Sequence, residues 1–269
     1  MSATADLKEP SGAVTSLDEA ASVPSSRLRA FVRLILIALL VAVCAAIHLV
    51  HRLFGPSPWP RRLLRGIGWL AGARVRSDGP RPGAGTLIVA NHVSWLDIPV
   101  LAGATDCAFV AKDSLRGHPF MRWLCEENGT VFVDRDTRSS VGEQVAAMEA
   151  AIRSHKPLTL FPEGTVGDGR TLLPFRSSLL SLAEQPPLPL TVQPVAIDYG
   201  RHAPEFGWPT GEKGEANFLR LLGRRGTVAV TLHFLEALPQ GLDRKALARL
   251  SRAAVADAIA SGGAVPPRV

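Results

Sequence analysis

The sequence predicts an α/β domain with a mostly parallel central sheet flanked by helices, preceded by an N-terminal membrane helix. Three observations carry this prediction. Short runs rich in β-branched residues alternate with helix-like stretches from residue 73 onward. A long apolar run precedes them at residues 34–50. Of the 269 residues, 46% are hydrophobic and only 6% are aromatic, which suits a core built from aliphatic side chains.

Composition divides the chain into four segments. Residues 1–26 are rich in Ser, Ala, Thr and Pro without a helical stripe, so we expect a disordered tail. Residues 27–72 form the membrane helix and a basic interfacial segment. Residues 73–262 form the α/β domain, whose motifs lie within 86–200, and residues 263–269 form a flexible tail.

The apolar run is interrupted only by His48, and its length lies near the lower limit of roughly 17 residues for a membrane span. A cleaved signal peptide is disfavoured, because the run begins deep in the chain and no small-residue cleavage site follows it. A spanning helix and a helix lodged in one leaflet both remain open, since basic residues flank both ends.

Residues 53–77 contain arginines and tryptophans but no acidic residue. This composition is typical of an interfacial segment that faces anionic headgroups, and the alternative is a solvated basic helix. The net charge of +6 also favours anionic partners. Nucleic acid is not expected as a partner, because the basic residues adjoin the apolar run and Tyr199 is the only tyrosine.

Seven strands are expected in the domain, at residues 73–77, 86–91, 107–112, 130–135, 158–163, 190–199 and 227–236. Helices are expected at residues 120–128, 140–155 and 243–261. Polar loops follow the second to fifth strands. In a parallel sheet, loops at the carboxyl ends of the strands lie along one edge, where chemistry collects.

The first of these loops, "NHVSWLD", places Asp97 five residues after His92. If a turn leads into a helix here, the carboxylate can orient the imidazole, and the second ring nitrogen can take a proton. Ser94 lies too near His92 to complete a hydrolase triad, and the chain has no GxSxG elbow. A substrate hydroxyl is therefore the better nucleophile. The alternative is a capping Asp beside a core His.

The loop "FPEGT" presents Glu163 between Pro and Gly in a tight turn, with Gly164 and Thr165 beside it. Two other strands end in Lys112 and Arg135, where cations could hold a phosphate. The three cysteines are widely spaced and form no metal motif, so we expect free thiols and neither a metal nor a cofactor.

Together, "NHVSWLD", "FVAKDSLRGHP", "GTVFVDR", "FPEGT" and "VQPVAI" resemble the motifs of the glycerolipid acyltransferases in order and spacing over about residues 65–200. The resemblance implies a glycerol-3-phosphate acyltransferase-like fold, membrane attachment and transfer of an acyl chain from acyl-CoA or acyl carrier protein to a lysolipid hydroxyl. It implies that His92 is the base and Asp97 its orienting partner. It also implies that Arg135 and Lys112 hold the acceptor phosphate, and that Glu163, Gly164 and Thr165 shape the acceptor pocket.

One departure bears on the acceptor. Many phosphatidic-acid-forming members continue FPEGT with Arg-Ser, whereas residues 166–169 here read "VGDG", as in the subgroup that includes lyso-ornithine lipid acyltransferases. We expect 1-acyl-sn-glycerol-3-phosphate as the acceptor, with lyso-ornithine lipid as the alternative. A non-catalytic membrane-binding module of the same fold is a second alternative. The expected location is the inner membrane, with the catalytic domain on the cytoplasmic side.

Overall fold

A central sheet of seven strands organises the computed structural model, which describes residues 25–117, 119–133, 151, 156–184 and 189–262. Within these residues the spatial order of the strands is β1-β7-β6-β2-β5-β3-β4. The strands are β1 (Ala73–Asp78), β2 (Thr86–Ala90), β3 (Ala108–Lys112), β4 (Val131–Val133), β5 (Leu158–Leu160), β6 (Thr191–Asp198) and β7 (Val228–Phe234). Each of the seven corresponds to a strand expected from the sequence.

The helices are α2 (Arg27–Arg52), α3 (Trp59–Leu70), α4 (Asp97–Thr105), α5 (Pro119–Asn128), α7 (Ser181–Glu184), α8 (Ala203–Phe206), α9 (Gly214–Gly223) and α10 (Arg244–Gly262). The 3₁₀ turns are η1 (Asp113–Gly117), η3 (Ser177–Leu180) and η4 (Gly200–His202). The helices expected at 120–128 and 243–261 are confirmed by α5 and α10. The helix expected at 140–155 and the two expected tails lie almost entirely outside the described residues.

Five neighbouring strands, β6, β2, β5, β3 and β4, run parallel, which confirms the mostly parallel sheet. At the other edge β7 pairs antiparallel with β6, and β1 pairs parallel with β7. The sequence pattern did not predict this reversal, because the direction of a strand leaves no trace in its own alternation of side chains.

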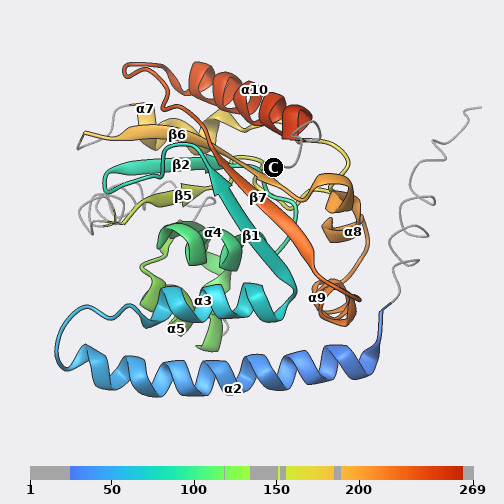
Figure 1. Cartoon of the computed structure of the whole chain (residues 1–269). Coiled ribbons are helices and arrows are strands. Elements are labelled where there is room, and N and C mark those ends of the chain that lie inside the picture. The colour runs from blue at the N-terminus through green and yellow to red at the C-terminus, as the bar shows by residue number, and fades with distance from the viewer. Residues whose placement is uncertain (1–24, 118, 134–150, 152–155, 185–188, 263–269) are drawn as a thin grey trace, which may run out of the picture.

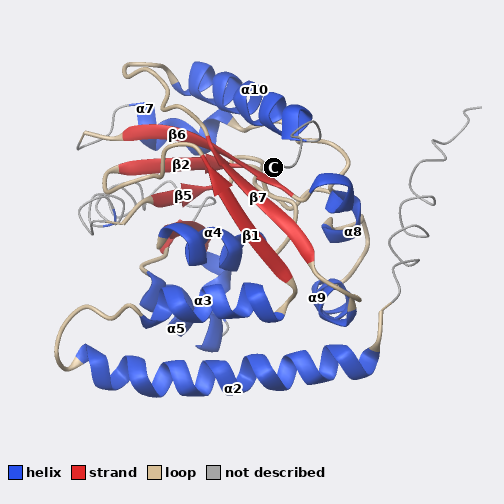
Figure 2. Cartoon of the chain, viewed as in Figure 1, coloured by secondary structure: helices blue, strands red, loops and turns tan. Residues whose placement is uncertain are grey.

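The strand β2 lies at the centre of the core and is buried along its whole length. Its side chains alternate between the two faces, as the pleat requires. Ile88 packs with helices α3, α4 and α9 on one face, whereas Leu87 and Val89 pack on the other face with α10. Figures 1 and 2 show these layers, with α10 on one side of the sheet and α3 and α4 on the other.

The helix α2 forms an outermost layer and runs along α3 (Figure 1). Near its N-terminus, Arg33 Nη1 donates to the carbonyl oxygens of Leu222 at 2.9 Å and Arg224 at 3.1 Å. Near its C-terminus, His48 Nε2 lies 2.8 Å and Arg52 Nη1 2.6 Å from the Glu127 carboxylate. Both ends of α2 are therefore bonded to the α/β domain.

By length and composition, α2 could cross a membrane, and only 11% of its most apolar window is buried. It therefore differs from the core helix of a soluble protein, which would be mostly buried. Its exposed large apolar side chains are Leu28, Phe31, Val32, Leu34, Ile35, Leu36, Leu39, Val43, Ile47, Leu49 and Val50.

Candidate active site

The loop between β2 and α4 carries the first polar motif. Asn91, directly after β2, fixes the start of this loop to the neighbouring strand β6. Its side-chain amide donates to the Ile197 carbonyl at 3.0 Å and accepts from the Ile197 N–H at 2.8 Å. The next residue, His92, is therefore held at the carboxyl end of β2.

His92 and Asp97 are in direct contact. His92 Nδ1 lies 2.8 Å from Asp97 Oδ2, and the same oxygen accepts from the backbone N–H groups of Val93 at 2.7 Å and Ser94 at 2.9 Å. These donors offset the burial of the carboxylate, which is 0% exposed. Because a carboxylate only accepts, Nδ1 carries a proton, and in the neutral imidazole Nε2 then has the free lone pair.

Tyr199 completes this network and was not singled out from the sequence. Its phenol O–H donates to Asp97 Oδ1 at 2.6 Å, and both side chains are buried. Burial and the Asp97 charge raise the pKa of Tyr199 well above its ordinary value, so the phenol stays a donor. The available signal was its position at the end of the "VQPVAIDY" strand, on the same sheet edge as His92.

Glu163 follows β5, which neighbours β2 in the sheet. Its Oε1 accepts from the His92 backbone N–H at 2.8 Å, and its Oε2 accepts from the Leu173 N–H at 3.2 Å. Burial raises the pKa of this carboxyl group to about 7, against the lowering effect of the two N–H donors. Glu163 therefore fixes the backbone of the loop between β2 and α4 that carries His92, which we call the histidine loop.

Two further contacts constrain the imidazole and its surroundings. The His92 ring stacks on Phe161, with ring centroids 4.1 Å apart and an interplanar angle of 13°. Ser94 is 0% exposed, and its Oγ accepts from the Leu96 N–H at 3.3 Å. The serine hydroxyl is therefore inside the protein and has no access to a substrate.

A cavity of about 570 Å³ opens beside His92. Polar and charged side chains from several loops line it together with an apolar wall from α10. The main lining residues are His92, Glu163, Arg170, Asp198, Tyr199, Arg201 and Ile259. The His92 side chain is 15% exposed and lines this cavity, so the imidazole is accessible to a ligand.

The other predicted site residues are placed differently. Gly164, at φ +73°, and the exposed Thr165 form the turn after Glu163, and neither lines the cavity. Lys112 ends β3, two strands from β2 in the sheet, and only its backbone is described. Arg135 lies outside the described residues.

Residues 166–169, which begin where many phosphatidic-acid-forming members carry Arg-Ser, connect the loop after β2 to α8. The Gly167 N–H donates to the His92 carbonyl at 2.8 Å, and the Gly167 carbonyl accepts from the Trp208 N–H at 2.9 Å. A Cβ at Gly169 would lie 2.1 Å from the Ala203 carbonyl oxygen, so only glycine fits there. This segment ties the histidine loop to the start and end of α8.

A buried carboxylate–imidazole pair at a strand end of an α/β sheet is a candidate acid–base site. The Acyltransferase family profile matches residues 73–198, and the chain belongs to the glycerolipid acyltransferase family.

The similar relatives include two lyso-ornithine lipid O-acyltransferases. The one from Pseudomonas aeruginosa is 36% identical over 86% of this chain and 93% of its own length. The one from Rhizobium meliloti is 36% identical over 72% of this chain and 73% of its own. A 1-acyl-sn-glycerol-3-phosphate acyltransferase from Helicobacter pylori is 29% identical over 64% of this chain and 73% of its own.

The fold also matches a solved structure. The crystal structure of the 1-acyl-sn-glycerophosphate acyltransferase from Thermotoga maritima aligns with a TM-score of 0.62 at 21% identity. The alignment covers 89% of this chain and all of that one. Acyl transfer to a lysolipid is thus the activity of the family. Between the two expected acceptors, the relatives favour lyso-ornithine lipid, which the sequence analysis ranked second.

Proposed function

We propose that this protein is a membrane-bound O-acyltransferase that acylates lyso-ornithine lipid, using acyl-CoA or acyl carrier protein as the donor. The observation that carries the reaction is the His92–Asp97 pair, whose imidazole lines the cavity and contacts Asp97 through Nδ1. The acceptor is supported by the full-length similarity to lyso-ornithine lipid acyltransferases and by the charges that line the same cavity.

In the proposed reaction, His92 Nε2 takes the proton of the acceptor hydroxyl as the oxygen attacks the thioester carbonyl. A C–O bond forms, the C–S bond breaks, and the leaving thiolate takes the proton from the imidazolium. Asp97 holds the ring and stabilises its transient positive charge. Burial of Ser94 supports direct transfer without an acyl-enzyme.

The headgroup is the second part of the proposal. Ornithine offers an ammonium and a carboxylate, so its site should present charges of both signs. Asp198 lines the cavity and is largely buried, and its Oδ2 accepts no hydrogen bond from the described residues. The Nε2 atom of His233 lies 3.8 Å from this oxygen. Arg201 is exposed on the same cavity. A buried carboxylate would repel a phosphate and attract an ammonium.

A second acceptor, 1-acyl-sn-glycerol-3-phosphate, is favoured by Lys112 at the end of β3 and, from the sequence alone, by Arg135. Val166 stands where many phosphatidic-acid-forming members carry an arginine, which removes one phosphate ligand. A lost charge-assisted hydrogen bond is worth about 1.5–3 kcal/mol, or tenfold or more in preference. This departure therefore weighs toward lyso-ornithine lipid.

We further propose that α2 lies in the plane of one leaflet. A spanning helix would carry its ends to opposite sides of the bilayer, whereas both ends of α2 are bonded to one domain. Its exposed apolar face suits burial at the headgroup–acyl boundary. Both donor classes are cytoplasmic, so we place the domain on the cytoplasmic face of the inner membrane.

The test is a competition assay with purified full-length protein, both lysolipids and one acyl donor. Lyso-ornithine lipid should be acylated faster. Asp198→Asn should slow this reaction by about tenfold or more and leave the phosphate acceptor less affected. Asp257→Asn, which removes an exposed carboxylate on α10, is the matched control and should change neither rate. Faster acylation of the phosphate acceptor would refute the proposed headgroup.

The same assay tests the base. His92→Ala should lower both reactions by about 10²–10⁴-fold, because removal of a general base has this effect. His51→Ala, at an exposed histidine of α2, should leave both rates unchanged. More than half of the normal rate in the His92 variant would contradict its assignment as the base.

A further inference from the structure

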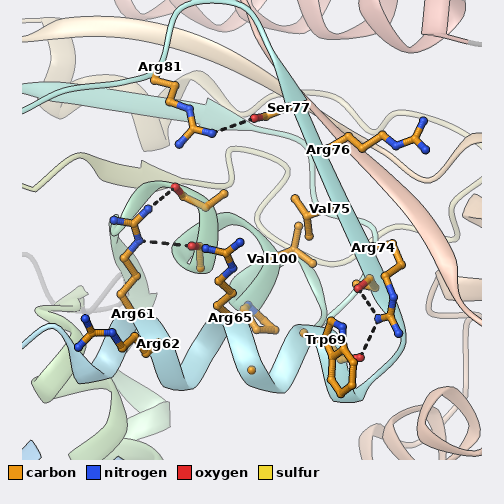
Figure 3. Close-up of a pocket in the computed structure, with 16 residues that line it drawn as sticks. Arg61, Arg62, Arg65, Trp69, Arg74, Val75, Arg76, Ser77, Arg81 and Val100 are labelled. Carbon is orange, nitrogen blue, oxygen red and sulfur yellow. Dashed lines mark hydrogen bonds between the residues drawn. The ribbon is translucent and has the colours of Figure 1, made fainter. Parts of the chain in front are cut away.

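A second groove, of about 590 Å³, lies apart from the candidate active site (Figure 3). It is bounded by α3, α4 and the edge strand β1, and it shares no lining residue with the cavity beside His92. Arginine is its most frequent lining residue. The arginines are Arg61, Arg62, Arg65, Arg74, Arg76 and Arg81, and we call this site the arginine groove.

The positive charge of the arginine groove is not neutralised within the described part of the chain. No acidic residue lines it, and none of its six arginines forms an ion pair with a described Asp or Glu. Arg61 and Arg74 donate to backbone carbonyls only. A concave surface lined by one sign of charge focuses its field and attracts a counter-ion.

Three of these side chains converge. Arg61 and Arg65 lie one turn apart on α3 and rise into the groove, while Arg81 reaches toward them from the opposite wall (Figure 3). Arg81 donates to Ser77 Oγ at 3.3 Å, and Arg65 has no hydrogen-bond partner among the described residues. Planar guanidinium groups bind phosphate oxygens in pairs, so this arrangement matches a phosphate.

The base of the groove is rigidly packed. A Cβ added at Gly103 of α4 would lie 2.7 Å from the Arg65 Cα, so the two helices meet backbone to backbone. Arg61 also caps the end of α4 by donating to the Ala104 carbonyl at 2.9 Å. The backbone of α3, which carries these arginines, is therefore packed closely on α4 over a floor of small residues.

The position of the groove identifies the source of the phosphate. The other side of α3 packs on α2, where a Cβ at Gly66 would contact Leu40. Trp69, at the end of α3, is 59% exposed, and the Arg74 guanidinium lies 4.8 Å from its ring centroid. Tryptophan and arginine one layer above an apolar helix lie at the headgroup level of a bilayer.

We propose that the arginine groove binds the phosphate headgroup of an anionic membrane phospholipid, separately from the acyl acceptor. An acidic carrier protein is disfavoured, because the site is concave and lies only one helix layer, α3, away from α2, which we place in the membrane. The proposal rests on that membrane placement but not on the acceptor. Lipid binding can therefore be measured without turnover.

The test uses the full-length protein in detergent, incubated with equal amounts of phosphatidylglycerol and phosphatidylcholine, with bound lipid read by native mass spectrometry. The protein should retain phosphatidylglycerol preferentially. The double variant Arg65→Gln, Arg81→Gln should lose this preference by about tenfold or more. The double variant Lys245→Gln, Arg249→Gln makes the same charge change at exposed positions on α10 and should keep it.

Further arms separate the possible sources of the signal. Arg65→Lys, Arg81→Lys keeps the charge but removes the paired donors, so it should retain less phosphatidylglycerol than the original protein. Glycerol phosphate should not displace the lipid at equal concentration. Three results would each overturn the proposal. They are equal retention of both lipids, no effect of the double variant Arg65→Gln, Arg81→Gln (the glutamine pair), and binding of acyl carrier protein that the glutamine pair abolishes.

The membrane placement is checked separately. Pelleting with pure phosphatidylcholine vesicles reports α2 insertion and should be the same for the original protein and the glutamine pair. Thermal unfolding of each variant confirms its fold. If the original protein does not pellet with these vesicles, the membrane placement is refuted. If it pellets but shows no preference for phosphatidylglycerol, only the proposal of headgroup binding in the arginine groove is refuted.

Discussion

Asp97 is the residue around which the candidate site is ordered. Its fully buried carboxylate receives two backbone N–H groups, the His92 ring and the Tyr199 phenol. The backbone donors come from the turn that connects β2 to α4, so the same carboxylate stabilises this turn and holds the His92 ring. Removal of either Asp97 or Tyr199 would leave buried partners unsatisfied, which costs about 1–3 kcal/mol each.

Glu163 gives a prediction at the same scale. Its carboxyl pKa is raised from 4.5 to about 7 by burial. Between these values the folded protein keeps a proton that the unfolded chain has lost. Raising the pH through this window therefore lowers the free energy of unfolding, and the loss is complete above the folded pKa. Glu163→Gln should reduce this pH dependence, as measured by urea unfolding at about pH 5 and about pH 8.

The control for this prediction is Glu236→Gln, which changes an exposed carboxylate on the surface. It should leave the pH dependence as in the original protein. Glu163→Gln also places an amide N–H against one of two backbone N–H groups, so a lower overall stability is expected at every pH. An unchanged pH dependence in this variant would mean that Glu163 is ionised throughout.

At the scale of elements, α2 decides how the domain meets the membrane. Single cysteines introduced at Ser25 and Pro56 flank the helix, in a background where the three native cysteines are replaced. In cells opened to expose the cytoplasmic side, both should react with a membrane-impermeant maleimide, because an in-plane helix keeps both ends on one side. Intact spheroplasts provide the control, and neither position should react there. Opposite labelling of the two positions would establish a spanning helix.

The whole molecule has two unlike sides, with α2 and α3 on one and α10 on the other (Figure 1). Val43, on the outer face of α2, is 56% exposed. Val43→Glu should weaken membrane binding and make it sensitive to salt, because arginine contacts remain and exposed charges are screened. The amount of protein that pellets with membranes at low and at high salt measures this effect. Ala253→Glu on α10 is the matched control. Equal, salt-resistant pelleting of both variants would exclude this face of α2 as the anchor.

Local pattern sufficed to predict every strand, the long helices α2 and α10 and the motif residues, whereas the class of reaction followed from the resemblance of those motifs to a known family. Period-2 runs of β-branched residues specify strands, and the His92–Asp97 spacing brings the two side chains together within one short turn. It was also predictable that the loops after β2 and β5 lie on the same edge of the sheet, because the carboxyl ends of parallel strands share an edge. The contact between Glu163 and the His92 backbone follows from that arrangement.

The sequence by itself thus determined the fold class, the pairing of His92 with Asp97 and an apolar helix of membrane character. Tertiary structure decided what depends on residues far apart in the chain. Tyr199 reaches Asp97 across 102 positions, β7 reverses direction, and α2 is bonded at both ends to the domain. The arginines of residues 61–81 read as a basic stretch, yet only the packing of α3 on α4 beside β1 makes them one groove. Such contacts are set by the global packing of side chains, which no local periodicity encodes.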